Sequence, residues 1–142
     1  MERCVRLSYR YHDADLVELT AYAWSGTFGG TTRLYVGHGE LASASDALTG
    51  FPANLDDERE VTFGAFGRDS GAGAVALKLT CIDRAGHCAL HVTLESDPLL
   101  RDSPLDRVEL CGAVEPAALN RFVDQMKILN TSLGGSAVLQ FA

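Results

Sequence analysis

Residues 74–96, AVALKLTCIDRAGHCALHVTLES, contain the clearest structural pattern in the sequence. Apolar residues alternate with polar ones in both halves, which is typical of two strands that each bury one face. A register that opposes apolar to apolar is favoured, because a shift by one residue would set leucines against His91 and Thr93. That register pairs Val75 with Leu94, Leu77 with Val92, and Leu79 with Leu90. The stretch is therefore predicted to be an antiparallel hairpin.

The same register predicts a four-residue loop over 83–86 and sets Cys81 opposite Cys88. The loop fits a type I turn, with Gly86 free to take positive φ. A redox disulfide is one interpretation of the cysteine pair. However, cross-strand Cβ atoms lie ~4.5–5.5 Å apart, more than the ~3.8 Å of a relaxed disulfide. Both cysteines continue rows of apolar residues, so we expect them to be core thiols.

Outward from the hairpin, a period of two recurs along the chain. In the first strand, the residues expected on the buried face are Val5, Leu7, Tyr9 and Tyr11, and polar residues alternate with them. Further strands are expected at 17–24, 31–36, around 61–63, 108–114 and 137–141. Turn-forming residues at 96–98 and 102–104 precede the strand at 108–114.

Two segments switch to the helical period. Leu41, Ala44 and Leu48 follow i, i+3, i+7 spacing, which predicts a helix over 39–49. Pro116 opens a second helix over 115–129, because the first helical position does not need the missing N–H. Its apolar stripe consists of Leu119, Phe122, Val123, Met126 and Leu129. The break at 130–135 ends this helix.

These elements predict an α+β fold: a mainly antiparallel, meandering sheet of about seven or eight strands with two helices on one face. The 142 residues correspond to a single domain, 1–142. Hydrophobic residues make up 46% and charged residues 22%, which is ordinary for a folded, soluble chain.

The net charge indicates which partners the protein could bind, and the first residues indicate its cellular location. Twelve Lys and Arg against nineteen Asp and Glu give a net charge of −7, which disfavours nucleic acid and anionic membranes and suits a basic partner. Charges interrupt the first ten residues, unlike a secretory signal, and no apolar run is long enough to span a membrane. We therefore expect a cytoplasmic protein with reduced cysteines.

The residues with metal-binding or catalytic potential do not form a recognisable motif. On a strand, His87 and His91 would lie roughly 13 Å apart, too far to share an ion. His91, opposite Lys78, is expected to be a solvated surface residue. The chain has no nucleophile motif, no Cys-x-x-Cys and no phosphate-binding loop. We expect no catalytic residue, no metal and no cofactor, and the sequence favours a binding protein over an enzyme.

Aromatic residues on polar faces are the most distinctive functional signal. Tyr22 and Trp24 share the parity of Glu18, opposite the apolar parity of their strand. An open face would present them with Tyr35 and the nearby Asp15 as a surface for a partner. If both faces were covered, the same aromatic residues would belong to the core.

The order of elements resembles that of small bacterial proteins grouped with immunity proteins of contact-dependent toxin systems. The stretches that carry the resemblance are DLVELTAYAW (15–24) and GELASASDALTGFP (39–52), followed by the strand pair 74–95 and the helix 115–129. The resemblance implies a non-enzymatic protein that sequesters a partner, and it supplies no active-site residues.

Two alternatives remain at the level of the sequence. A small enzyme or ligand-binding domain would use a pocket between the sheet and the helices, with His12, Asp13 and His38 as its polar groups. A self-associating protein would pair the strand at 137–141 with its copy in a homodimer.

Overall fold

The computed structural model describes residues 2–67, 71–98, 104–129 and 134–142. Its elements are β1 (Cys4–His12), β2 (Val17–Trp24), β3 (Gly29–Val36), α1 (Glu40–Leu48), β4 (Glu58–Gly64), β5 (Ala74–Cys81), β6 (Cys88–Glu95), β7 (Arg107–Val114), α2 (Pro116–Leu129) and β8 (Ser136–Gln140). The α+β class, the antiparallel pairing and the order of elements are confirmed. Parts of two predicted segments, 102–103 and 130–133, lie outside the described residues.

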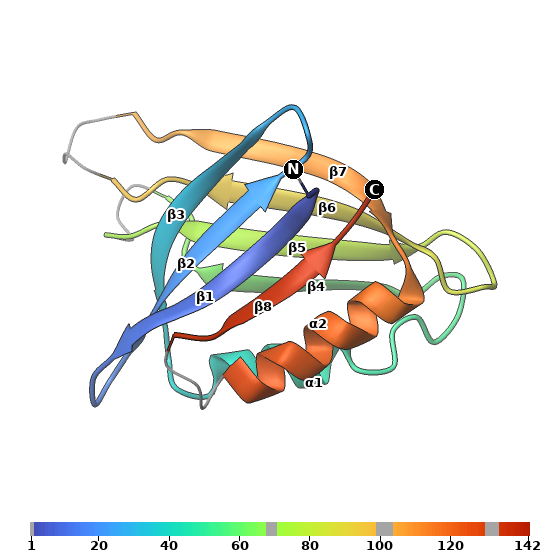
Figure 1. Cartoon of the computed structure of the whole chain (residues 1–142), viewed down its shortest axis with the longest axis horizontal. Helices are drawn as coiled ribbons and strands as arrows, with labels where there is room; N and C mark the ends of the chain where they lie inside the picture. The colour runs from blue at the N-terminus through green and yellow to red at the C-terminus, as the bar shows by residue number, and fades with distance from the viewer. Residues whose placement is uncertain (1, 68–70, 99–103, 130–133) are drawn as a thin grey trace.

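The strands form two sheets rather than one. The first sheet has the order β3-β2-β1-β8 and the second has the order β4-β5-β6-β7. Figure 1 shows the sheets facing each other with crossed strand directions. The division arises because each helix interrupts the meander: α1 leads from β3 to β4, and α2 leads from β7 back to β8 beside β1. Each long connection lets the chain leave one sheet and enter the other.

The central hairpin has the predicted register at every pair, including Cys81 opposite Cys88 and Lys78 opposite His91. The main-chain N–H of Ile82 donates to the carbonyl of His87 at 2.8 Å, which closes the predicted loop. Gly86 in this loop has a φ of 88°, as the turn requires. Matching apolar side chains across the two strands was sufficient to predict the register of this hairpin, because its inner face is buried.

The first strand departs from strict alternation. β1 pairs with β2 through Tyr9 and Leu19 and then through Tyr11 and Glu18, so Arg10 is an additional residue in β1. A bulge of this kind moves the following side chains to the other face. The prediction that Tyr11 is buried was therefore wrong: it is 61% exposed and lies on the outer face beside Glu18.

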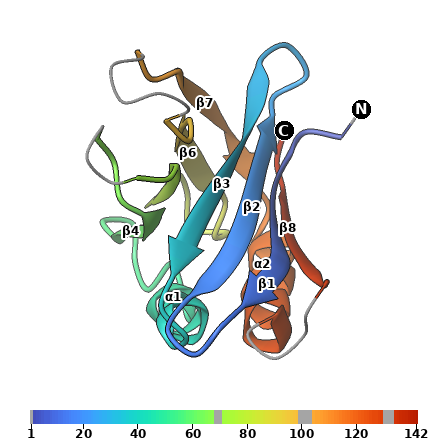
Figure 2. The same ribbon diagram turned by 90° about the vertical axis from the view of Figure 1, so that its left-hand side faces the viewer.

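The helices lie side by side along one open side between the sheets (Figures 1 and 2). Their apolar stripes are buried as predicted. Ser45 of α1, which is fully buried, donates its hydroxyl to the carbonyl of Val123 in α2 at 3.0 Å. In the described part of the chain, no helix has the length and apolar character needed to cross a membrane.

A cluster of buried apolar side chains draws on all eight strands and both helices. Its largest fully buried members include Phe63, Phe122 and Met126, which fill the space between the sheets and the helices. This shared core explains why two sheets of four strands fold together: neither could bury its inner face alone.

The C-terminal residues connect the two sheets. Beyond the end of β8, Ala142 exchanges two main-chain hydrogen bonds with Ala113 of β7, at 2.8 and 2.9 Å. The ring of Phe141 fills the space above Gly112, where any added Cβ would overlap it. The last residues therefore fix the edge of the first sheet against the second.

Candidate binding face

The outer face of the first sheet carries side chains of alternating strand positions, as an antiparallel sheet with one solvated face should. We call this surface the aromatic face and define it by Arg6, Tyr11, Glu18, Tyr22, Trp24, Arg33 and Tyr35. All of these side chains are at least partly exposed. Tyr, Trp and Arg are the residue types that contribute most to protein-binding hot spots.

Tyr35 and Glu18 form the first contact on this face. They are opposite each other on β3 and β2, and the Tyr35 hydroxyl donates to Glu18 Oε1 at 3.1 Å. Desolvation, and after it this hydrogen bond, raises the pKa of Tyr35, so the hydroxyl keeps its proton. Arg33 lies 5.9 Å from the centre of the Tyr35 ring and forms a 2.7 Å ion pair with Asp97.

Arg6 and Tyr22 form a second contact across β1 and β2. They are directly opposite in register, and the Arg6 guanidinium carbon lies 4.7 Å from the centre of the Tyr22 ring. This is a cation–π distance, worth ~0.5–1 kcal/mol at an exposed site. The contact holds the Tyr22 ring in place while leaving part of it open to a partner.

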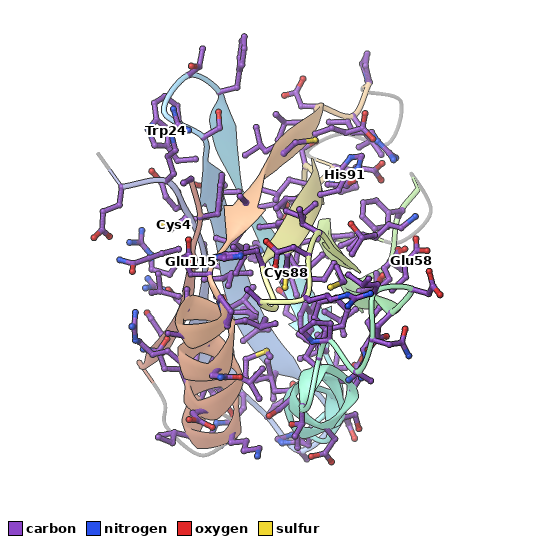
Figure 3. All side chains as sticks on the ribbon, turned by 90° about the vertical axis from the view of Figure 1, so that its right-hand side faces the viewer. Cys4, Trp24, Glu58, Cys88, His91 and Glu115 are labelled. Atoms are coloured by element: carbon purple, nitrogen blue, oxygen red, sulfur yellow. The ribbon has the colours of Figure 1, made fainter. Side chains whose placement is uncertain are left out.

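Trp24 packs across the end of the face. Its cross-strand neighbour is Gly29, where an added Cβ would meet the indole Cε3 at 2.6 Å. An aromatic ring laid over a cross-strand glycine shields the backbone from water. On the other side of Trp24, Cys4 is only 4% exposed, and its burial raises the pKa of its thiol. Figure 3 shows Trp24 on the opposite side of the molecule from Glu58 and His91.

Four of the five residues proposed from the sequence for a partner surface lie on this face: Glu18, Tyr22, Trp24 and Tyr35. Asp15 lies instead in the β1–β2 turn, where its main-chain N–H donates to the carboxylate of Asp13 at 2.8 Å. Arg6, Arg33 and Tyr11 also lie on this face, although they were not predicted from the sequence to contact a partner. The alternating pattern of their strands would have placed Arg6 and Arg33 on the outer face, whereas the position of Tyr11 depends on the bulge in β1.

His12, Asp13 and His38, the polar groups of the alternative ligand pocket, do come together. The rings of His12 and His38 lie 5.9 Å apart, and His38 Nε2 contacts the Asp13 carbonyl at 2.7 Å. The Asp13 carboxylate accepts the N–H groups of Asp15 and Leu16, and these bonds lower its pKa. The groups therefore stabilise the β1–β2 turn and its contact with the segment before α1.

His87 lies between two carboxylates that the sequence did not connect. Its Nδ1 contacts Asp83 at 2.8 Å and its Nε2 contacts Glu115 at 2.9 Å. Hydrogen bonding and charge from Asp83, followed by the charge of Glu115, raise the pKa of His87. Because both ring nitrogens are occupied, neither is available as a general base. We therefore interpret this cluster as a clasp between the β5–β6 loop and the start of α2.

The outer face of the second sheet has a different character. Lys78 forms a 2.7 Å ion pair with Glu58, and His91 lies 3.5 Å from Glu109. Across the described ranges, no group of three His, Cys, Asp or Glu side chains is arranged to hold a metal ion. This face offers exposed polar residues that can serve as controls for variants of the aromatic face.

Comparisons of the chain with protein-family models, with curated proteins and with solved structures find no match. Functional inference therefore rests on the chemistry and geometry of the residues described above.

Proposed function

We propose that the protein is a non-catalytic binding module that uses the aromatic face to hold a protein partner. The observation that carries the proposal is the row of four aromatic side chains on the outside of the first sheet, where Tyr11 is 61% and Tyr35 is 36% exposed. Contacts to Arg6 and Glu18 already order two of the tyrosines. Ordered side chains lose less conformational entropy on binding, which favours affinity.

The charge distribution supports a partner that is basic overall. The chain carries a net charge of −7, which attracts a basic protein over long range. On the aromatic face, the charge of Arg33 is compensated by Asp97 at 2.7 Å. The face also carries one further positive charge, at Arg6, and one negative charge, at Glu18. The face is thus close to neutral locally, so it does not oppose this attraction while the aromatic side chains supply the contact.

The resemblance to toxin-immunity proteins indicates a biological role for such binding, namely the sequestration of a toxin. An immunity protein acts by tight, stoichiometric sequestration rather than by turnover, and it needs no catalytic group of its own. We propose that this chain sequesters a basic protein in the bacterial cytoplasm. A fast, salt-sensitive association and a slow dissociation would be expected for such a pair.

The proposal is tested by capture from the lysate of the source organism, identification of the retained protein, and titration with the purified partner. We expect one basic protein at a stoichiometric ratio. The Tyr11→Ala/Tyr35→Ala variant should weaken its binding at least about 100-fold, as expected when two anchors are removed. The matched control, His91→Ala/Thr93→Ala on the second sheet, should change affinity less than about threefold.

Two results would contradict the proposal. Equal loss of binding in both variants would mean that the aromatic face is not the contact surface. Turnover of a small-molecule substrate by the purified chain would mean that the protein is an enzyme. Both variants must first show the thermal unfolding of the wild type, which their exposed positions lead us to expect.

A further inference from the structure

Cys81 and Cys88 lie directly opposite each other at the end of the β5–β6 hairpin. Cys88 is fully buried, whereas Cys81 is partly exposed at the edge of the core. Neither thiol has a part in the proposed function, because both lie in the second sheet and the aromatic face lies on the first. An inference about this pair therefore does not depend on that function.

The hydrogen bonds of the hairpin show how close the two cysteines are. The main-chain N–H of Cys81 donates to the carbonyl of Asp57, just before β4, so it does not face Cys88. The N–H of the next residue, Ile82, donates across the hairpin to the carbonyl of His87 at 2.8 Å. Cys81 and Cys88 therefore form a non-hydrogen-bonded pair, in which the Cα atoms of antiparallel strands lie only ~4.5 Å apart.

The spacing of such a pair lies at the edge of the range for a disulfide. Disulfides have Cα separations of about 4.4–6.8 Å and Cβ separations of about 3.5–4.5 Å. Cross-strand Cβ atoms lie ~4.5–5.5 Å apart and are closest in non-hydrogen-bonded pairs. A bond between Cys81 and Cys88 would thus be strained, and strained disulfides are reduced easily. This geometry favours a disulfide that forms and breaks over a permanent one.

The two thiols are directed towards the same loop. Cys81 Sγ donates to the carbonyl of Asp83 at 3.1 Å, and Cys88 Sγ donates to the carbonyl of Gly86 at 3.3 Å. Burial, and after it the charge of Cys81, raises the pKa of Cys88 to about 11, as expected for a buried thiol beside a second sulfur atom. Because thiols are weak hydrogen-bond donors, these two bonds are easily given up when a sulfur atom reacts.

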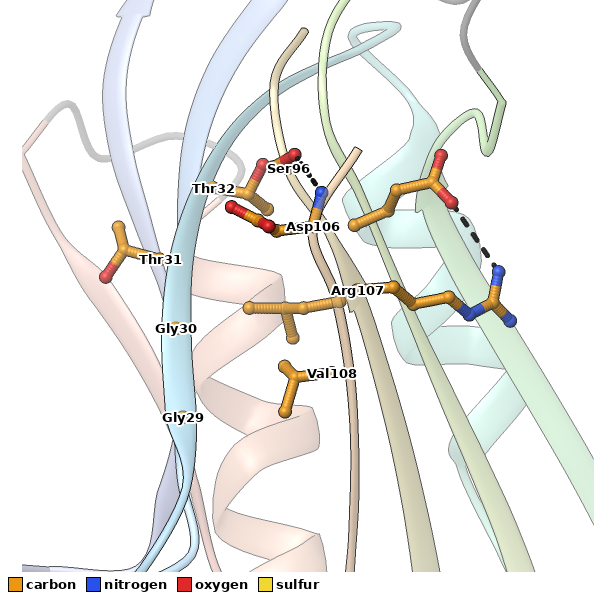
Figure 4. Close-up of a pocket in the computed structure, with 10 residues that line it drawn as sticks. Gly29, Gly30, Thr31, Thr32, Ser96, Asp106, Arg107 and Val108 are labelled. Carbon is orange, nitrogen blue, oxygen red and sulfur yellow. Dashed lines mark hydrogen bonds and ion pairs between the residues drawn. The ribbon is translucent and has the colours of Figure 1, made fainter. Parts of the chain in front are cut away.

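A pocket gives small molecules access to Cys81. It has a volume of about 250 Å³ and lies between the segment that follows α1 and the β5–β6 loop, with Pro52 on one side and Cys81 and the exposed Arg84 on the other. By contrast, no cysteine is among the described residues that line the cleft at the other end of β6, which Figure 4 shows. Because Cys88 is buried, a reagent in the pocket would meet Cys81 first.

We propose that Cys81 and Cys88 form a reversible disulfide, with a low-molecular-weight disulfide as the oxidant. The Cys81 thiolate attacks one sulfur of the oxidant, R–S–S–R; the S–S bond of the oxidant breaks, Cys81 becomes a mixed disulfide, and RS⁻ leaves. The Cys88 thiolate then attacks the Cys81 sulfur and releases the second RS⁻. The two leaving groups take up the two protons that the cysteines lose. One R–S–S–R thus becomes two RSH, while the chain loses two electrons and two protons.

Oxidation of the folded full chain with glutathione disulfide, followed by alkylation and non-reducing tryptic digestion, tests the proposal. Trypsin cleaves after Lys78 and Arg84, so the two cysteines fall in separate peptides, 79–84 and 85–101, which a disulfide would join. We expect mass spectrometry to find these two peptides linked, while the buried Cys4 stays reduced. Dithiothreitol should restore both thiols without unfolding the protein.

Three variants separate the steps. Cys81→Ser should abolish the link and leave Cys88 reduced, because the buried thiol does not meet the oxidant. Cys88→Ala should stop at the mixed disulfide, with one glutathionyl group on Cys81. Cys111→Ser, which removes the exposed thiol, is the matched control and should keep the link. The digest of the wild type shows whether the link forms even if a variant at the buried Cys88 fails to fold.

Four results would overturn the proposal. The first is a wild-type chain in which Cys81 and Cys88 stay reduced although the exposed Cys111 is modified. The second is a wild-type chain that stops at a mixed disulfide on Cys81. The third is pairing of either cysteine with Cys4 or Cys111 instead, and the fourth is loss of the link in Cys111→Ser.

Discussion

At the scale of single residues, the two sheets approach each other closely at Gly73. Its N–H donates to the carbonyl of Arg33 in β3 at 2.8 Å. A Cβ at this position would lie 2.8 Å from the Glu95 carbonyl oxygen and 2.9 Å from that of Arg33, and it would overlap the hydroxyl of Thr32. Backbone atoms of strands cannot move aside independently, so only glycine fits between them.

Gly73→Ala is therefore expected to lower the free energy of unfolding by about 3 kcal/mol or more, the upper range for overpacking a buried site. Gly30→Ala is the matched control, because its Cβ would have its first contact at 3.9 Å. That variant should lie between no change and a gain of about 1 kcal/mol, because alanine restricts the unfolded chain. Urea unfolding measures both. Equal stabilities of the two variants would contradict the packing described here.

The four cysteines differ in the solvent exposure of their thiols. All are free thiols: Cys4 and Cys88 are buried, Cys81 is partly buried and Cys111 is exposed. Burial, followed by the charges of Cys81 and Asp83, raises the pKa of Cys88 to about 11. The expectation that Cys88 is a core thiol is confirmed, whereas Cys81 lies at the edge of the core with its thiol directed to the Asp83 carbonyl.

Alkylation of the native protein near pH 8 should therefore modify Cys111 first and leave Cys4 and Cys88 unmodified until the chain unfolds, because reaction requires an accessible thiolate. Mass spectrometry of timed samples with iodoacetamide gives the order directly. The same labelling in urea provides the control for total reactivity. Early modification of Cys88 in the folded protein would contradict its placement between the sheets.

At the scale of elements, the clasp around His87 joins two parts of the second sheet and α2. Asp83 is in the β5–β6 loop, and Glu115 immediately precedes α2; both carboxylates contact the same imidazole ring. Burial acts to raise the pKa of Asp83, but the hydrogen bonds from His87 and from the N–H of Ala85 outweigh it, and the pKa of Asp83 is lowered. The raised pKa of His87 and the lowered pKa of Asp83 are two consequences of one contact.

Protonated His87 is favoured in the folded state, so its contribution to stability is complete below the unfolded pKa of about 6.5. That contribution is lost as the pH rises through the raised pKa of the folded state. We expect the wild type to lose more stability than His87→Asn between about pH 6 and pH 9. His91→Asn, which removes a histidine facing one carboxylate, is the control. Thermal unfolding across this range measures the difference, and parallel curves for wild type and His87→Asn would contradict the clasp.

At the scale of the whole molecule, stability depends on joining the two sheets. The contacts between Phe141 and Gly112 and between Ala142 and Ala113 connect β8 to β7. The buried Ser45 hydroxyl connects α1 to α2 on the open side of the sheets. Because both sheets share one core, we expect a single cooperative unfolding transition rather than two.

Phe141→Ala should lower the free energy of unfolding by about 3–5 kcal/mol, the usual cost of removing a buried phenylalanine ring. Gln140→Ala, at the neighbouring exposed position, should change it by less than about 0.5 kcal/mol. Chemical unfolding followed by tryptophan fluorescence and by circular dichroism tests both expectations. Separate transitions for the two probes in the wild type would show that the sheets unfold independently.

The sequence determined the local structure of this protein to a large extent. The hairpin register from Val75 to Leu94 and the helix that begins at Pro116 were both predicted correctly. Each depends on apolar side chains within one element or between adjacent strands, where periodicity alone decides which face is buried. For the same reason, Tyr22 and Trp24 could be assigned from the sequence to the face opposite the apolar residues of their strand, whereas the structure was needed to show that this face is partly exposed.

Only the tertiary structure decided how these elements combine. The division into two sheets depends on where α1 and α2 redirect the chain, and the exposure of Tyr11 depends on one additional residue in β1. The clasp at His87 brings together residues from different elements. Such contacts have no sequence period, because they arise when surfaces distant in the chain are packed against a common core.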